Sequence, residues 1–409
     1  MYRIEAELLI PGQGEPVPDG VVILDGQAIS YAGAAAAAPA TTGAMVHRTE
    51  TVMPGMWDCH GHFFGSRSMD LSRLPLEPIP LRAARCARDL ASALGAGITS
   101  VREVGGLGVY LARAVAEGVL DGPAIYAAGS VLSTTGGHAD LHSFPQRWIE
   151  DFGRNCGELR TADGLDDCMR AVREQLRLGA RLIKVCASGG VMSELDNPIH
   201  QQFTAAELRA IVEVAALAER VVAAHCHGKP GIMAALEAGV RTIEHGSYLD
   251  DEACDAMLET GAILVPTRSI VEDIKANLDA VPDYAAAKLT ALADQHAAAI
   301  SLAIKRGVTI AMGTDIAMTG PDLINSWGGN GSELVHLVTL GMTPLQAIEA
   351  ATATAPLTIG PQAPRSGRLE AGYDADVITL GGDPLADISL LARPEHITGV
   401  WTGGRQVKG

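Results

Sequence analysis

Residues 178–190 read LGARLIKVCASGG, and they contain the unit from which the fold can be predicted. A glycine follows a helical segment, a continuous apolar run comes next, and a Ser-Gly-Gly loop ends it. Glycine is favoured just past a helix because it accepts a left-handed backbone conformation. An apolar run without polar alternation is typical of a parallel strand that is covered on both faces. The stretch therefore predicts a helix end followed by a buried strand.

The same unit recurs on both sides of this stretch. Further copies are GAGITSVREVGG (95–106), AERVVAAHCHG (218–228), EAGVRTIEHGS (237–247), ETGAILVPT (259–267) and KRGVTIAMGTD (305–315). The segments TVMPGMWDCHGH (51–62) and GPAIYAAGSV (122–131) bring the predicted strands to eight. Eight strand–helix units predict an α/β fold, a (β/α)8 TIM barrel. An open doubly wound sheet is the alternative, but no GxGxxG follows a strand where that fold would need it.

The two chain ends lack the helix repeat. Residues 1–52 and 365–409 contain short strand-like pieces such as GVVILDGQAISYAG and ITGVWTGGRQVKG. We expect both ends to form one small β-domain beside a barrel of residues 53–364.

Composition excludes several classes of function. The chain has 409 residues and a net charge of −17, which argues against a nucleic-acid or anionic-membrane partner. No run of 18 apolar residues occurs, and the N-terminus resembles neither a signal peptide nor an anchor. Seven cysteines form no CxxC pair, so we expect reduced thiols and a cytoplasmic enzyme.

Two histidines, His60 and His62, stand at the end of the first predicted barrel strand. Residues i and i+2 of a strand share a face, so both imidazoles are expected to point the same way. Two converging neutral imidazoles suit a zinc-like ion. An HxH pair alone is a weak signal, because such pairs also occur on surfaces and in cores.

Three more polar residues stand at equivalent places in later repeats: His225, His245 and Asp315. Each follows an apolar strand, and the strand ends of a barrel converge on its C-terminal rim, where active sites lie. Any one of them could be an ordinary structural residue. Together with the HxH pair they predict a metal-dependent active site.

Lys184 interrupts the apolar run of residues 182–187, where a buried ammonium is costly unless it is paired or neutralised. Burial lowers the pKa of a lysine, and a neutral amine can add carbon dioxide to form a carbamate. The carbamate is an anion with two oxygens that can bridge two metal ions. A Schiff-base lysine is the alternative, but it leaves the histidines and Asp315 without a role.

These residues lie in stretches that resemble the amidohydrolase superfamily, in its binuclear subtype with a carboxylated lysine on strand four. Within it the chain is similar to the prolidase-like, imidazolonepropionase-related group. The matching stretches, which lie within residues 53–384, are PGMWDCHGH, STTGGHAD, IKVCASGGVMS, AAHCHG, AGVRTIEHG, MGTD and GRLEAGYDADVITLGGDP.

The resemblance implies a distorted (β/α)8 barrel with a flanking β-sandwich and a site for two divalent metal ions, expected to be zinc. It assigns one ion to His60, His62 and Asp315. It assigns the other to His225 and His245, and the carbamate of Lys184 bridges the two. One-metal deaminases of the superfamily have a glutamate three residues after the strand-five histidine, whereas this chain has Gly228, which favours the two-metal hydrolase.

Other residues are expected to act on the substrate. Asp315 is the expected general base. It is expected to take a proton from a water molecule shared by the two metal ions, which leaves a bridging hydroxide, and to pass that proton to the leaving amine. His138, in TTGGHAD, is expected to hydrogen-bond the substrate carbonyl or a carboxylate, although the family pattern has Gly where this chain has Ala139. His227 is expected to contact a substrate carboxylate, with a surface residue as the alternative. Tyr248 is a weaker candidate, for which a packed rim aromatic is the alternative.

Two cysteines flank the predicted ligands. Strand alternation predicts that Cys186 and Cys226 both face the helix layer as core thiols.

The predicted function is hydrolysis of the amide bond of N-acyl amino acids or dipeptides, in the manner of a carboxypeptidase or prolidase. The expected partner is a small molecule with a free carboxylate, and we expect a homo-oligomer as in relatives. The alternatives are hydrolysis of a carbamate, a cyclic amide or a xenobiotic or toxin amide, and a non-catalytic barrel scaffold.

Overall fold

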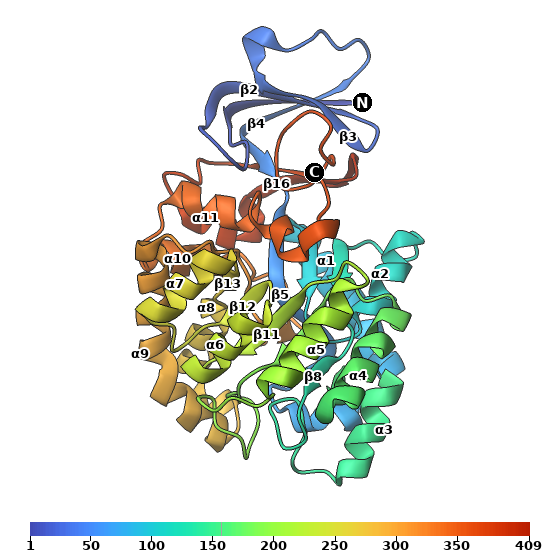
Figure 1. Cartoon of the computed structure of the whole chain (residues 1–409). Helices are drawn as coiled ribbons and strands as arrows, with labels where there is room; N and C mark the ends of the chain where they lie inside the picture. Colours follow the sequence, from blue (N-terminus) through green and yellow to red (C-terminus); the bar gives the residue numbers. More distant parts are fainter. Residues whose placement is uncertain (157) are drawn as a thin grey trace.

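Two parallel β-sheets carry the predicted repeat in the computed structural model, which describes residues 1–156 and 158–409 (Figure 1). The first sheet has the strand order β14 (Ile316–Met318), β5 (Met56–Ser66), β6 (Ile98–Glu103) and β7 (Ala124–Ala127). The second has the order β13 (Ile263–Val265), β12 (Thr242–His245), β11 (Val222–Cys226), β10 (Ile183–Cys186), β8 (Val131–Ser133) and β9 (Leu159–Thr161). Neighbouring strands within both sheets are parallel, which gives an α/β, TIM-barrel-like fold.

The predicted eighth strand, residues 305–315, differs from the structure. The assigned strand β14 begins only after this stretch, and the stretch itself runs between β13 and β5. Ala311 N donates to Leu264 O at 3.0 Å, and Cys59 N donates to Met312 O at 2.9 Å. These backbone hydrogen bonds connect the two sheets on this side.

The two sheets do not join into one closed sheet within the described ranges. Asp315 has a left-handed φ of 61°, which interrupts extended pairing just before β14. On the other side of the barrel, Arg181 N donates to Ala127 O at 2.8 Å, which ties the start of β10 to the end of β7. Full closure of the barrel stays a prediction. The edge strand β9 was not expected from the sequence.

Helices lie outside the strands in Figure 1. Their bounds are α1 (Ile79–Gly95), α2 (Gly108–Ala116), α3 (Gln146–Cys156), α4 (Gly164–Leu178), α5 (Ala205–Ala216), α6 (Lys229–Ala238), α7 (Asp251–Thr260), α8 (Arg268–Ala276), α9 (Asp283–Arg306), α10 (Ser332–Thr339) and α11 (Pro344–Ala351). Short 3-10 helices are η1 (Ala35–Ala37), η2 (Leu71–Leu76), η3 (Leu278–Ala280), η4 (Ala355–Gln362), η5 (Ile388–Ala392) and η6 (Pro394–His396). Left-handed glycines end several helices, as the repeat predicted: Gly179, Gly239, Gly261 and Gly307.

The core lies between the parallel strands and this helix layer. All residues of β5, the strand that carries the HxH pair, are buried, so packing on both faces holds this strand in position. Six cysteines are buried and unpaired, in agreement with reduced thiols. The side chain of Cys156 lies outside the described residues.

The two chain ends share one seven-stranded sheet, which lies at the top of Figure 1. Its order is β17 (Arg405–Lys408), β16 (Ile397–Thr402), β15 (Val377–Leu380), β4 (Met45–Pro54), β1 (Tyr2–Leu9), β2 (Val17–Asp25) and β3 (Ala28–Ala34). The N-terminal strands β1 and β4 pair in parallel, and β15 from the C-terminal end pairs with β4 in antiparallel fashion. Its description as a separate sandwich domain stays a prediction.

Among the described residues, no helix combines the length and the apolar character that crossing a membrane requires.

Candidate metal centre and active site

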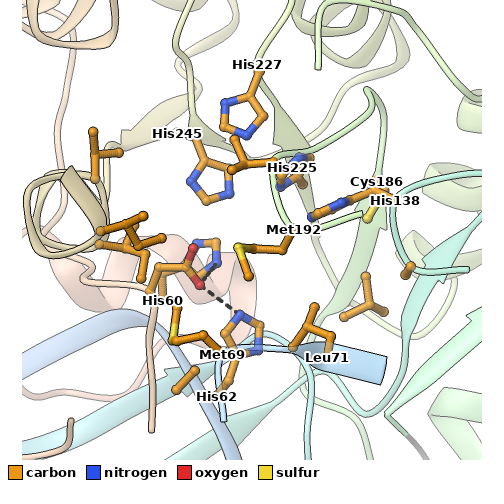
Figure 2. Close-up of a pocket in the computed structure, with 18 of the residues that line it drawn as sticks. His60, His62, Met69, Leu71, His138, Cys186, Met192, His225, His227 and His245 are labelled. Atoms are coloured by element: carbon orange, nitrogen blue, oxygen red, sulfur yellow. Dashed lines mark ion pairs between the residues drawn. The ribbon is translucent and has the colours of Figure 1, made fainter. Parts of the chain in front are cut away.

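The predicted ligands all line one cavity at the C-terminal ends of the barrel strands (Figure 2). The HxH pair lies on β5, Lys184 on β10, His225 on β11 and His245 at the end of β12, while Asp315 immediately precedes β14. The cavity contains about 960 Å³ of space between atoms, part of which is open to solvent. The repeat thus brings together six side chains that are up to 255 residues apart in the chain, from residue 60 to residue 315.

One group consists of His60, His62 and Asp315. Asp315 Oδ1 lies 3.1 Å from His62 Nε2 and 3.5 Å from His60 Nε2. Metal–nitrogen bonds of about 2.0–2.1 Å in a tetrahedron separate the ligand atoms by about 3.3 Å. The observed separations match that spacing, so the donor set fits a zinc-sized ion.

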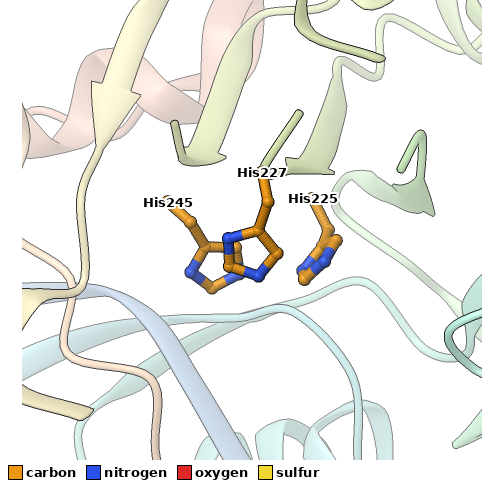
Figure 3. Close-up of side chains that lie close together, drawn as sticks. All are labelled: His225, His227 and His245. Atoms are coloured by element: carbon orange, nitrogen blue, oxygen red, sulfur yellow. The ribbon is translucent and has the colours of Figure 1, made fainter. Parts of the chain in front are cut away.

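A second group consists of His225, His227 and His245 (Figure 3), whose ligand atoms all lie within 4.8 Å of one another. The rings of His225 and His245 have centroids 4.5 Å apart, and the ring of His245 is 5.0 Å from that of His60. The two groups are therefore neighbours. His227, for which the sequence suggested a more distant substrate contact, is near enough to belong to the second donor set.

Hydrogen bonds at Nδ1 orient the imidazoles of the first group. His62 Nδ1 donates to Gly105 O at 2.7 Å, because a carbonyl oxygen only accepts. His60 Nδ1 donates in the same way to Glu244 Oε2 at 2.7 Å. Both Nε2 atoms are then unprotonated and available to a metal. Arg102 holds Glu244 from the other side, with Nη2 at 2.7 Å from both carboxylate oxygens.

A threonine hydroxyl and a backbone carbonyl orient two imidazoles of the second group. His245 Nδ1 lies 2.7 Å from Thr267 Oγ1, which leaves its Nε2 toward the cavity. His225 has the reverse arrangement: its Nε2 donates to Gly189 O at 3.1 Å, so that Nδ1 is the free nitrogen. Such outer partners fix ring orientation and tautomer in metal sites. Each ring therefore has one nitrogen committed to the protein and one left for a ligand.

Substitution of Glu244 by glutamine is expected to weaken metal binding at the His60 position by about 10–100-fold, because the ring loses its charged orienting partner. The Gln amide group would also face Arg102, which can only donate. Isothermal titration calorimetry, in which zinc is added to the apoprotein, measures this affinity. Glu259→Gln, at an exposed helix position, is the matched control. Equal zinc affinities in the two variants would contradict the assigned role of Glu244.

Burial keeps three of the histidines, His60, His225 and His245, neutral at physiological pH. It lowers the pKa of His60 to about 4, with the nearby Lys184 ammonium as the second cause. Burial also lowers the pKa values of His225 and His245 well below the usual range, and neighbouring histidines add to the effect. A neutral imidazole is the form that binds metals.

Lys184 is the cationic group at the centre of this array. Its side chain is 3% exposed, and Nζ lies 3.4 Å from His60 Nε2. Burial lowers the pKa of Lys184, and Glu244 only partly opposes that shift. The amine is therefore shifted toward its nucleophilic, neutral form.

The Asp315 carboxylate remains ionised despite its partial burial. Burial acts to raise its pKa, but His60 and His62 outweigh this effect and bring the pKa to about 2. The backbone at the site is also strained: His245 has a φ of 69° and Thr267 a φ of 56°. Left-handed non-glycine residues are uncommon and cluster at functional sites.

The other predicted residues are placed differently. His138 lines the cavity, and its ring stacks on that of His225 with centroids 4.3 Å apart. Tyr248 is half-buried and packs against the apolar cluster beside the cavity, and it is not among the cavity-lining residues.

The expectation that Cys186 faces the helix layer is wrong. Cys186 lines the cavity, because it is two residues from Lys184 on the same strand and therefore shares its face (Figure 2). Burial raises the pKa of its thiol to about 12, so it is a neutral wall residue. Cys226 is fully buried and does not line the cavity, as expected.

An apolar wall covers the rest of the cavity. Helices α8 and α9 supply much of it, and two methionines lie close to the imidazoles in Figure 2. The apolar lining residues are Phe64, Met69, Leu71, Val131, Ala139, Leu159, Val191, Met192, Ile270, Val271, Ile274, Leu289, Leu292, Ala317 and Met318. The cavity thus combines a polar floor of ligands with an apolar wall, the usual composition of a small-molecule site.

Comparisons with known proteins agree with this geometry. An ochratoxinase from Aspergillus niger is 44% identical over 423 aligned residues, which cover 99% of this chain and 86% of the relative. The crystal structure of A. niger ochratoxinase has a TM-score of 0.94 and 43% identity, and covers 100% of this chain and 95% of that chain. A Xaa-Pro dipeptidase with methionine bound in its active site has a TM-score of 0.87 and 30% identity, with 100% of both chains covered.

The model of the amidohydrolase family matches residues 51–407, which includes every candidate ligand described above. This chain therefore belongs to the amidohydrolase family, in its prolidase-like group, and is a hydrolase that acts on amide bonds.

Proposed function

We propose that the protein is a binuclear metal-dependent amidohydrolase that cleaves the amide bond of N-acyl amino acids or dipeptides. The observation that carries this proposal is the pair of adjacent donor groups in one cavity, with the Lys184 amine beside them. The dipeptidase among the similar structures supports the same reaction type.

The two donor groups support a proposed set of ligands for the two ions. His60, His62 and Asp315 would hold one of them. His225 and His245 would hold the other, and Lys184 would bridge both after its amine adds carbon dioxide and releases one proton. When bound, the ions polarise the substrate carbonyl and lower the pKa of a water molecule toward neutrality.

The protein side chains then move the proton and hold the substrate. Asp315, ionised and next to the HxH pair, accepts the proton of the attacking water and returns it to the leaving amine. The apolar wall excludes water and accommodates an apolar group of the substrate. His227, whose Nδ1 lies 2.7 Å from Ser247 Oγ, is proposed to contact a substrate carboxylate.

A toxin amide is a second candidate substrate. The observation that favours it is the 44% identity to an ochratoxinase over 99% of this chain. The mainly apolar cavity wall suits a large apolar acyl group in either case.

The zinc-loaded enzyme should cleave N-acyl amino acids and dipeptides that have an apolar acyl group, and it should cleave their C-terminal amides at least about tenfold more slowly. The reason is that an amide cannot replace the charge-assisted hydrogen bond of a free carboxylate. Liquid chromatography of the released amino acid measures both rates.

His227→Asn should abolish this preference for free acids, whereas His200→Asn, at an exposed position, should retain it. Equal rates for acids and amides in the wild-type enzyme would contradict carboxylate recognition. Failure to cleave either set, with two zinc ions bound per chain, would overturn the N-acyl amino acid proposal. Cleavage of ochratoxin by the same sample would then select the toxin amide.

A further inference from the structure

A hydrogen-bonded chain of side chains lies behind His138, in the loop that follows β10. His138 Nδ1 lies 2.8 Å from Ser193 Oγ, and Ser193 Oγ donates to Asp196 Oδ1. A carboxylate oxygen only accepts hydrogen bonds, so the single hydroxyl proton of Ser193 is used there. The other acceptor within reach of that proton, Gly190 O at 3.4 Å, is also acceptor-only. Ser193 Oγ must therefore accept from His138, whose proton is on Nδ1.

Three donors besides Ser193 fix Asp196 in place. Oδ2 accepts from Gly190 N at 2.9 Å and from Gln202 Nε2 at 3.0 Å. Oδ1 lies 3.2 Å from Lys288 Nζ, which reaches in from α9 and also donates to Ser193 O at 2.6 Å. The Asp196 side chain is only 5% exposed. Each of these buried polar groups has a hydrogen-bond partner, so the Asp196 carboxylate is held in one position by a complete hydrogen-bond network.

The His138 ring has little freedom. A Cβ on Gly190 would lie 2.1 Å from His138 Nδ1, so that only glycine leaves room for the ring in this position. The His138 backbone N–H donates to Gln202 Oε1 at 3.1 Å, and the ring stacks on His225. With Nδ1 turned to Ser193, the opposite nitrogen, Nε2, is left for the cavity that His138 lines.

We propose that Ser193 and Asp196 are positioning residues that hold His138 in its Nδ1–H tautomer, so that Nε2 offers an acceptor to the substrate amide. This deepens the proposed function and rests on it. It also changes the role expected for His138, because a neutral ring in this tautomer cannot donate to a carbonyl. The matching substrate group is the N–H of a secondary amide, which an N-alkylated amide lacks.

Nitrogen-15 NMR of the histidine rings in the zinc-loaded enzyme reads the tautomer directly. His138→Gln identifies the signals of this residue by their loss. The expected result is a protonated Nδ1 and an unprotonated Nε2. A protonated Nε2 in the wild-type enzyme would overturn the proposal. This result does not depend on which substrate the enzyme cleaves, so an error in the tautomer assignment can be distinguished from an error in the proposed function.

Asp196→Asn should reverse the hydrogen bonds. Gly190 N and Gln202 Nε2 retain the amide oxygen at the Oδ2 position, so the new amide nitrogen faces Ser193. The Ser193 hydroxyl proton is then free for His138 Nδ1, which at 2.8 Å is a nearer acceptor than Gly190 O at 3.4 Å, and the ring proton moves to Nε2. The expected result is that kcat falls by about 10–100-fold with two zinc ions retained and KM changed less than about threefold, as when a misplaced tautomer impairs a hydrolase triad. Asp294→Asn, at a side chain that is 98% exposed, is the control.

Ser193 provides the second pair of variants. Ser193→Ala should lower kcat in the same way, and Ser193→Thr, which restores the hydroxyl, should recover it. Ser130→Ala is the matched control, because Ser130 Oγ is buried without a hydrogen-bond partner among the described residues. Normal kcat in both Asp196→Asn and Ser193→Ala, with the ring proton still on Nδ1, would refute the positioning role.

The substrate preference completes the test. The wild-type enzyme should cleave a secondary amide faster than its N-methyl counterpart, and Asp196→Asn should reduce this ratio by about tenfold, since the acceptor is lost. A ratio that does not change would contradict an amide N–H as the partner of Nε2.

Discussion

Lys184→Met is expected to lower kcat/KM by more than about 10³-fold, because several kcal/mol of transition-state stabilisation would depend on the metal pair that we propose the lysine bridges. Methionine fills a similar volume but cannot form a carbamate. The expected accompanying change is a fall from two to about one tightly bound zinc ion per chain. Elemental analysis after gel filtration measures the zinc content, and steady-state kinetics measure the rate.

A chemical rescue distinguishes the carbamate from a role of Lys184 in folding. Added acetate or propionate can place a carboxylate between the metal positions in the smaller alanine variant, Lys184→Ala, and should restore part of the activity. Lys275→Met, at a half-exposed side chain, is the control for the substitution itself. Full activity and two zinc ions in Lys184→Met would contradict the bridging role.

Asp315→Asn is expected to lower kcat for amide substrates by about 10²–10⁴-fold, the usual contribution of a general acid–base group. Asparagine can still offer an oxygen to a metal, but it cannot take up a proton at neutral pH. Since the Asp315 carboxylate also contacts both histidines of the HxH pair, zinc content must be measured on the same sample. Asp322→Asn, at an exposed side chain, is the control.

Leaving-group dependence separates the two roles of Asp315. An amine must be protonated as it leaves, whereas an activated phenol leaves without a proton. The loss of rate in Asp315→Asn should therefore be much larger for an amide than for the matching activated ester. An equal loss for both substrates would show a ligand role alone and would exclude proton transfer to the leaving group.

The sequence was most informative where polar residues end apolar strands. His225 and Asp315 each follow such a run, and the barrel geometry brings strand ends together, so their meeting could be predicted from pattern alone. The predicted eighth strand was less exact, because the left-handed backbone of Asp315 moves the assigned strand to the residues after it.

Other parts of the site depend on tertiary packing. Five residues of the apolar wall come from α8 and α9, whose buried faces look like ordinary core in the sequence. The Arg102–Glu244 pair left a weak signal, since each charged residue stands in a strand that the repeat predicts to be buried, but its partner could not be identified from the sequence. Cys186 could have been placed correctly by counting two residues from Lys184.

The ratio of metal ions to protein chains at full activity tests the central claim most directly. Apoprotein is titrated with zinc in bicarbonate buffer, and amide hydrolysis and bound zinc are measured at each step. The account predicts that activity rises steeply with the second zinc ion and levels off at two per chain. Full activity at one zinc ion per chain, or in the presence of excess chelator with none bound, would contradict it.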